Sequence, residues 1–133
     1  RVLFRSAACG CKPPRDLTEG NRADDGSPAY SPDGKWLAYT AQSIPTFYAD
    51  RARLLLVDRA SGAMRDLSVA LNRSVGDLEW RPDSKALYSA IDDAATNRIW
   101  RFDLAAPGQP RAITTTPSFG SLAVATSGGA NCV

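Results

Sequence analysis

Short apolar runs separated by turn-forming residues characterise the middle of the chain. Trp36-Leu-Ala-Tyr39 and Leu54-Leu-Leu-Val57 are apolar without a strict alternation of polar and apolar positions. This pattern is typical of strands that are covered on both faces. Between such runs lie Pro, Gly, Asp and Ser, which favour tight turns. The pattern therefore predicts an all-β protein built from short strands.

Residues 27–40 predict a strand, a tight turn and a second strand. Pro32 presets the φ angle of the first central position of a type I turn. Asp33 follows, and Gly34 can adopt the left-handed conformation that starts a bulged hairpin. The strands are expected on either side of this turn, at 29–31 and 35–40.

The same pattern returns at residues 77–90, about 50 residues later. Trp80 aligns with Tyr30 in this second copy. Ser84 takes the position of Gly34, so we expect the second turn to be strained or of a slightly different type.

The likeness continues downstream of each turn. The further segments that pair with one another are 53–58 with 98–103, and 65–68 with both 111–114 and the upstream 15–18. Each unit thus holds four short strands, and units of about 40–50 residues with four strands are the signature of β-propeller blades. The sequence predicts a fragment of a β-propeller, with about two complete four-stranded blades (27–68 and 76–114) plus parts of two neighbouring blades. The alternative is an unrelated β-sandwich.

The pattern also divides the chain. Residues 13–126 form the predicted partial propeller domain, and Phe119 to Thr126 are interpreted as the first strand of a further blade. Residues 1–12 do not match the strand expected before 15–18, so we interpret them as a truncation or fusion scar. Residues 127–133 form a tail that does not continue the motif.

The connection at 42–52 is five residues longer than its counterpart in the second unit. In an up-and-down sheet alternate connections lie at the same edge, so this loop should share a face with 19–26, 69–75 and 115–118. The tight turns should lie on the opposite face. Extra loop length with two aromatic residues is where function is expected, although the simpler interpretation is an insertion that packs Phe47 and Tyr48 over the blade edge. Asp92 and Asp93 are expected in the shorter, solvated loop of the second unit.

Composition and charge narrow the choice of partners. The net charge is +2, from 16 basic and 14 acidic residues, with no block of like charge. The sequence therefore favours neither nucleic acid nor a membrane surface as a partner. No apolar run approaches the ~18 residues that a membrane span needs.

The chain lacks the side chains for several kinds of catalysis. It has no His, which excludes a Ser-His-Asp or Cys-His nucleophile within these residues. Its three Cys residues are Cys9, Cys11 and Cys132, and Cys9-x-Cys11 without His or further Cys is a poor metal site. We expect no catalytic residue, no metal and no cofactor in this chain.

The repeated motif resembles a known family. Ser-Pro-Asp-Gly-Lys-Trp-Leu-Ala-Tyr at 31–39, Arg-Asp-Leu-Thr at 15–18 and Tyr48-Ala-Asp-Arg51 are similar to the N-terminal propeller of prolyl-oligopeptidase-family serine peptidases, notably bacterial dipeptidyl-peptidases and acylaminoacyl-peptidases. The resemblance covers about residues 13–126. The Pro-Asp-Gly repeat also resembles the propeller of TolB, a scaffold protein without peptidase activity.

The resemblance implies a function outside catalysis. In the peptidase family the propeller caps an α/β-hydrolase domain that would lie elsewhere in the same parent chain, and it restricts access to short peptide substrates. The implied role is gating and docking, and Tyr48, Asp50 and Arg51 are the candidates for substrate or interdomain contact. The alternative is a TolB-like scaffold or protein-binding propeller without enzymatic activity. The compartment, bacterial cytoplasm or periplasm, stays open.

Two blades taken out of a ring would expose their flanking apolar faces. We therefore predict that the isolated chain self-associates or is loosely folded. Thermal melts at several protein concentrations, combined with sedimentation, measure this. A sharp, concentration-independent melt of a monomer would contradict the fragment interpretation.

Overall fold

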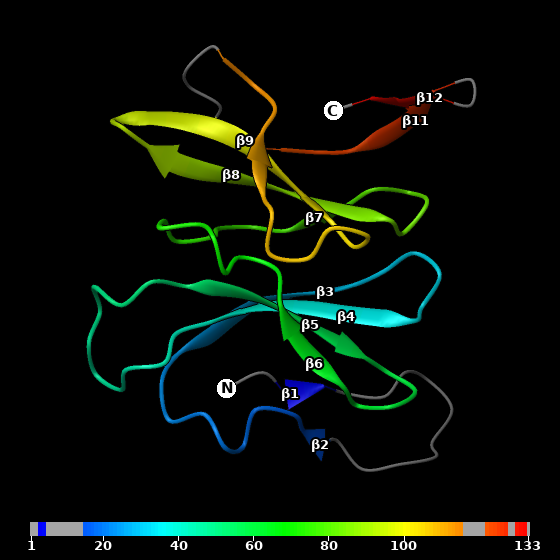
Figure 1. The fold of residues 1–133 in the computed structure, drawn as a ribbon. Helices are drawn as coiled ribbons and strands as arrows, with labels where there is room; N and C mark the ends of the chain where they lie inside the picture. Colours follow the sequence, from blue (N-terminus) through cyan, green and yellow to red (C-terminus); the bar gives the residue numbers. More distant parts are fainter. Residues whose placement is uncertain (1–2, 5–14, 116–121, 128–129, 133) are drawn as a thin grey trace.

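Two four-stranded antiparallel sheets, stacked against each other, make up the body of the protein (Figure 1). The computed structural model describes residues 3–4, 15–115, 122–127 and 130–132. Sheet one consists of β3 (Asp25–Tyr30), β4 (Trp36–Ala41), β5 (Arg53–Asp58) and β6 (Met64–Asp66). Sheet two consists of β7 (Glu79–Trp80), β8 (Ala86–Asp93), β9 (Thr96–Asp103) and β10 (Arg111–Ala112). Each sheet is an up-and-down meander in chain order, as the sequence predicts for each unit.

Two short strand pairs flank the sheets. β1 (Leu3–Phe4) pairs with β2 (Arg15–Asp16), and β11 (Ala125–Ser127) pairs with β12 (Ala130–Cys132). β2 lies at the start of the upstream segment 15–18, which the sequence relates to 65–68 and 111–114. β1 lies in the part of the chain that was left out of the predicted fold, so this part contributes a two-residue strand. Residues 119–121 of the strand predicted at 119–126 lie outside the described residues. Residues 122–124 are not in a strand, and β11 overlaps only the end of the predicted strand.

The two predicted tight turns adopt matching conformations. In the first, the Gly34 N–H donates to the Ser31 carbonyl at 2.8 Å, and Gly34 has a φ of 71°. In the second, the Ser84 N–H donates to the Arg81 carbonyl at 2.9 Å, and Ser84 has a φ of 61°. Ser84 is therefore held in the left-handed region that disfavours side chains, which is the strained alternative of the prediction.

The Ser84 hydroxyl also joins the two sheets. The Asp33 N–H donates to Ser84 Oγ at 3.0 Å, from the first turn to the second. A glycine in this position would relieve the backbone but lose this bond. The exchange of glycine for serine thus coincides with a polar contact between the two turns.

The main core lies between the sheets. Sheet one contributes Ala38, Leu54 and Leu56, and sheet two contributes Leu87 and Phe102, all at most 1% exposed. Burying each large apolar side chain stabilises the fold by about 2 kcal/mol. β4 is buried along nearly its whole length because its other face packs in a second cluster, formed by Leu37, Tyr39, Ala41 and Val57. The apolar runs are therefore covered on both faces, as their composition predicts.

A two-residue turn closes the hairpin between β8 and β9. Ala94 and Ala95 have φ angles of 50° and 61°, the conformation of a type I′ turn. The expected placement of Asp92 and Asp93 in a loop was therefore wrong, because both residues extend β8 and pair with Asn97 and Thr96.

The connections that the structure describes lie on two faces as predicted, whereas residues 116–118 of the 115–118 connection lie outside the described residues. The Gln42 N–H donates to the Asp24 carbonyl at 2.8 Å, and the Val75 N–H donates to the Ala52 carbonyl at 2.9 Å, so the 42–52 loop lies beside 19–26 and 69–75. At the opposite end of the strands the Arg59 N–H donates to the Lys35 carbonyl at 3.0 Å, which joins the two tight turns of sheet one. We call the first end the loop face. Over the described ranges the structure contains no helix long and apolar enough to cross a membrane.

Replacing Gly34 by Ala tests the turn. The added Cβ would meet only Arg59 Nη1, at an ordinary 3.6 Å, so the cost is the left-handed backbone alone. We expect Gly34→Ala to lower the free energy of unfolding by about 1 kcal/mol, measured by urea titration. Gly20→Ala is the matched control, because a Cβ there meets nothing within 4 Å and the backbone is not left-handed. Equal losses of unfolding free energy in Gly34→Ala and Gly20→Ala would contradict the requirement for a left-handed residue at position 34.

Candidate functional site

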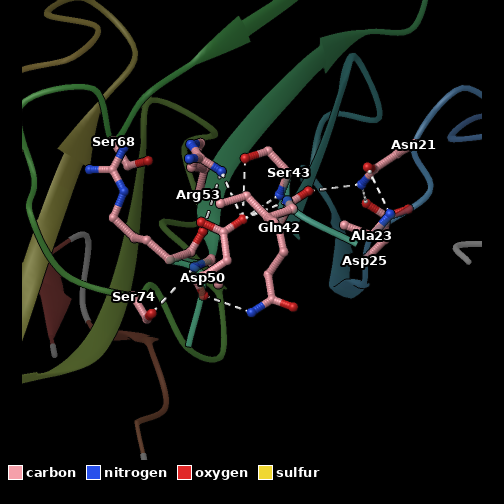
Figure 2. A network of polar contacts seen from close by, with 12 residues as sticks. Asn21, Ala23, Asp25, Gln42, Ser43, Asp50, Arg53, Ser68 and Ser74 are labelled. Atoms are coloured by element: carbon pink, nitrogen blue, oxygen red, sulfur yellow. Dashed lines mark hydrogen bonds and ion pairs between the residues drawn. The ribbon is translucent and has the colours of Figure 1, made fainter. Parts of the chain in front are cut away.

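The 42–52 loop between β4 and β5 is organised around a single carboxylate. Asp50 Oδ2 accepts hydrogen bonds from the Ser43 N–H at 2.6 Å, the Ile44 N–H at 2.9 Å and the Ser43 hydroxyl at 3.2 Å. Arg53 Nη1 lies 3.6 Å from the same oxygen. Figure 2 shows Asp50 turned inward toward Ser43 and Arg53. These contacts bind the last part of the loop to its first part.

The electrostatics of Asp50 follow from these contacts. The backbone N–H groups of Ser43 and Ile44 stabilise the charged form and lower the pKa of Asp50 from 3.8 to about 2, with smaller contributions from the Ser43 hydroxyl and Arg53. The residue is only 8% exposed, and partial burial opposes the shift. Asp50 is therefore a buried, ionised carboxylate whose Oδ2 is used within the loop.

The loop is also tied to both of its neighbours on the loop face. The Gln42 side chain donates to the Asp50 carbonyl at 2.6 Å, and Asn21 Nδ2 donates to the Gln42 carbonyl at 3.0 Å (Figure 2). On the other side, Arg51 Nη1 donates to the Leu71 carbonyl, and the Ala52 N–H donates to Ser74 Oγ at 3.3 Å. These bonds fix the base of the loop at several points.

The tip of the loop is apolar and faces solvent. Ile44 and Phe47 are about half exposed and Tyr48 is 94% exposed, with the two aromatic rings 6.4 Å apart. Residues 43–49 contain no charged side chain. Thr46 has a φ of 63°, which is unusual for a β-branched residue and is sustained only where the surroundings dictate the conformation. We call Ile44, Phe47 and Tyr48 the apolar tip.

The three residues singled out from the sequence occupy different environments. Tyr48 points to solvent and does not pack over the blade edge, so the simpler interpretation of the insertion does not hold for it. Asp50 and Arg51 make contacts within the protein. Their role in substrate or interdomain contact stays a prediction.

Sequence reasoning missed the partners of Asp50. Ser43 and Ile44 act mainly through their backbone N–H groups, which carry no residue-type signal. The one available clue was the spacing of Asp50 and Arg53, which places opposite charges at the end of the loop and the start of β5.

A second charged group lies on the loop face. Asp93 pairs with Arg73 at 3.3 Å and with Arg98 at 3.6 Å, which connects the end of β8 with the 69–75 connection. A group of His, Cys, Asp and Glu side chains that could hold a metal ion does not occur in the ranges described. The ion pairs of Asp93 therefore hold the 69–75 connection against the β8–β9 hairpin.

A cleft of about 600 Å³ opens beside β3 and β7, the first strands of the two sheets. Its lining includes Ser27, Asp77, Glu79 and Asn97, and Ser27 Oγ lies 3.4 Å from Asp77 Oδ1. Asn97 Oδ1 is buried there without a hydrogen-bond partner. The described lining combines these polar side chains with the apolar residues Ala29, Leu78 and Ala90.

Comparison with solved structures defines the class of protein. TolB from Acinetobacter baumannii matches with a TM-score of 0.59 and 23% identity, over 81% of this chain and 25% of the TolB chain. At this identity the match concerns the fold, which is a β-propeller. The two sheets are neighbouring blades, and the predicted fold of a partial all-β propeller is confirmed.

Comparison with curated proteins gives the particular relatives. Dipeptidyl-peptidase 5 of Porphyromonas gingivalis is 30% identical over 99 residues, which cover 74% of this chain and 14% of the relative. A probable dipeptidyl-peptidase 5 of Emericella nidulans is 32% identical over 84 residues, 63% of this chain and 12% of the relative. The dipeptidyl-peptidase 5 of Aspergillus fumigatus is 33% identical over 62% of this chain and 12% of its own length. No protein-family profile matches the chain.

The chain is thus a partial propeller related to a segment of dipeptidyl-peptidase 5 proteins. It spans about one seventh of the length of the first of these relatives.

Replacing Asp50 by Asn tests the carboxylate. Because the pKa of Asp50 is lowered in the folded protein, its contribution to stability is present above pH 4 and is lost as the pH falls toward 2. We expect the melting temperature of Asp50→Asn to lie below that of the wild type at pH 6, and the two to converge toward pH 2. Glu19→Gln, which removes an exposed carboxylate, controls for the change in net charge. A wild-type advantage that stays constant from pH 6 to pH 2 would contradict the assigned role.

Proposed function

We propose that this chain is a non-catalytic propeller segment of a serine peptidase of the prolyl-oligopeptidase family that hydrolyses short peptides. In this proposal an α/β-hydrolase domain elsewhere in the same parent chain carries the catalytic groups. The propeller segment docks on that domain and limits which substrates reach it. The observation that carries the proposal is the similarity to dipeptidyl-peptidase 5 proteins across 74% of the chain.

Two features of the chain support a role outside catalysis. The sequence contains no His, so it cannot supply the base of a Ser-His-Asp triad. The well-ordered contacts of the loop face are made between loops and leave an apolar tip exposed, which suits contact with another surface. Tyr48, Asp50 and Arg51 remain the candidates for substrate or interdomain contact within this proposal.

A second candidate function is that of a TolB-like scaffold, which binds other proteins and has no enzymatic activity. The observation that favours it is the fold similarity to TolB over 81% of the chain. In this case the loop face would bind a separate protein rather than a domain of the same chain.

Activity of the complete parent chain separates the two functions. We would express the whole open reading frame that contains these residues and assay it on chromogenic dipeptide and tripeptide amides, with and without a serine-directed fluorophosphonate. We expect cleavage that the fluorophosphonate abolishes, and labelling outside residues 1–133. The 133-residue chain alone is the control, because without a His it should neither cleave the amides nor be labelled. A parent chain that shows neither cleavage nor labelling would favour the scaffold function.

A further inference from the structure

The three residues proposed for contact differ in what they can offer to a partner. The Asp50 carboxylate is used by two backbone N–H groups, a hydroxyl and Arg53, and Arg51 donates to the Leu71 carbonyl. Asp50 is buried, so its Oδ2 cannot also hold the charged end of a peptide without losing those bonds, whereas the partly buried Arg51 is held to the 69–75 connection through one bond. Asp50 therefore holds the loop together and Arg51 ties it to the 69–75 connection, while the apolar tip is exposed.

The tip itself has the properties of a protein-binding anchor. Ile44, Phe47 and Tyr48 are exposed together, although leaving apolar side chains in contact with water is unfavourable in free energy. Aromatic side chains are enriched among the residues that dominate protein interfaces. Because the tip bears no charge, it fits an apolar surface rather than an acidic or basic one.

The loop is preorganised for such contact. Bonds to 19–26 on one side and to 69–75 on the other hold its base, and the Asp50 carboxylate joins its two ends. Thr46 keeps a left-handed backbone within this frame. A loop that is fixed before binding loses little conformational entropy on contact, which favours a stable interface.

We infer that the apolar tip docks into an apolar recess on a second domain of the same parent chain, with Phe47 and Tyr48 as the anchors and Asp50 as the positioning residue. The inference rests on the proposed function and selects interdomain contact over substrate contact. The choice of occupant is argued from the curated relatives, whose chains extend far beyond the matched segment, which is 14% of the first of them. A domain in the same chain is present at high effective concentration, so a small anchor holds it more firmly than it would hold a separate protein.

The test compares variants of the complete parent chain. Limited proteolysis gives the rate of cleavage between the propeller and the second domain, and small-angle scattering gives the separation of the two. We expect Tyr48→Ser and Phe47→Ser each to raise the cleavage rate at least about tenfold and to increase the radius of gyration. Ile113→Ser is the matched control, since Ile113 is also exposed, at 40%, but lies at the outer edge of sheet two.

Asp50→Asn separates positioning from contact. This variant leaves the tip side chains in place but weakens the loop that presents them, so it should raise the cleavage rate in the same direction. Lowering the pH toward 2 should not widen the difference in cleavage rate between Asp50→Asn and the wild type, because the Asp50 carboxylate of the wild type then takes up a proton.

Three outcomes would overturn the inference. The first is a cleavage rate and a radius of gyration that do not change in Tyr48→Ser and Phe47→Ser. The second is a raised KM for dipeptide amides with no change in domain separation, which would assign the tip to the substrate. The third is dissociation of a dimer in these variants, which would make a second copy the occupant. Both physical measurements need no catalysis, so an inactive parent chain would contradict the proposed peptidase function without deciding whether the tip docks.

Discussion

The apolar contact between the two sheets is the constraint on which the rest of the structure depends. A lone four-stranded sheet would leave one apolar face in water, and the packing of Leu54 and Leu56 against Leu87 and Phe102 removes that cost. Trp80 adds a polar link, because its indole N–H donates to the Ala29 carbonyl at 3.1 Å across the same interface. With the sheets fixed in this way, the strand ends gather the loops on one face.

The loop face then acquires its character from hydrogen bonds rather than from packing. A loop this short cannot form a hydrophobic core of its own. The Asp50 carboxylate stabilises it instead, because one carboxylate can accept hydrogen bonds from several N–H groups at once. The result is a loop whose carboxylate is buried and whose apolar side chains Ile44, Phe47 and Tyr48 are exposed, which is the reverse of a typical surface loop. This arrangement leaves apolar side chains exposed on a fixed loop, which is what the proposed docking function requires.

Much of the fold could be predicted from local chemistry. The Pro32-Asp-Gly34 turn and the apolar runs carry residue-type signals, so the strand after the turn was predicted to within one residue at each end. The strand before the turn begins at Asp25, four residues earlier than predicted. The β8–β9 turn was not predicted, because Ala94 and Ala95 adopt φ angles that Asn and Gly usually provide. The Asp50 network was also beyond prediction, because its donors are mostly backbone groups whose position depends on the folded loop.

The central claim is that these residues are two adjacent blades of a larger propeller whose loop face meets another domain. The structure of the complete parent chain, by crystallography or electron cryo-microscopy, tests it most directly. The account predicts a closed ring in which the two sheets are neighbours, with the Trp80 indole bonded to Ala29 and the 42–52 loop covered by a second domain. Two sheets that form an isolated sandwich, or a ring whose 42–52 loop faces only solvent, would contradict it.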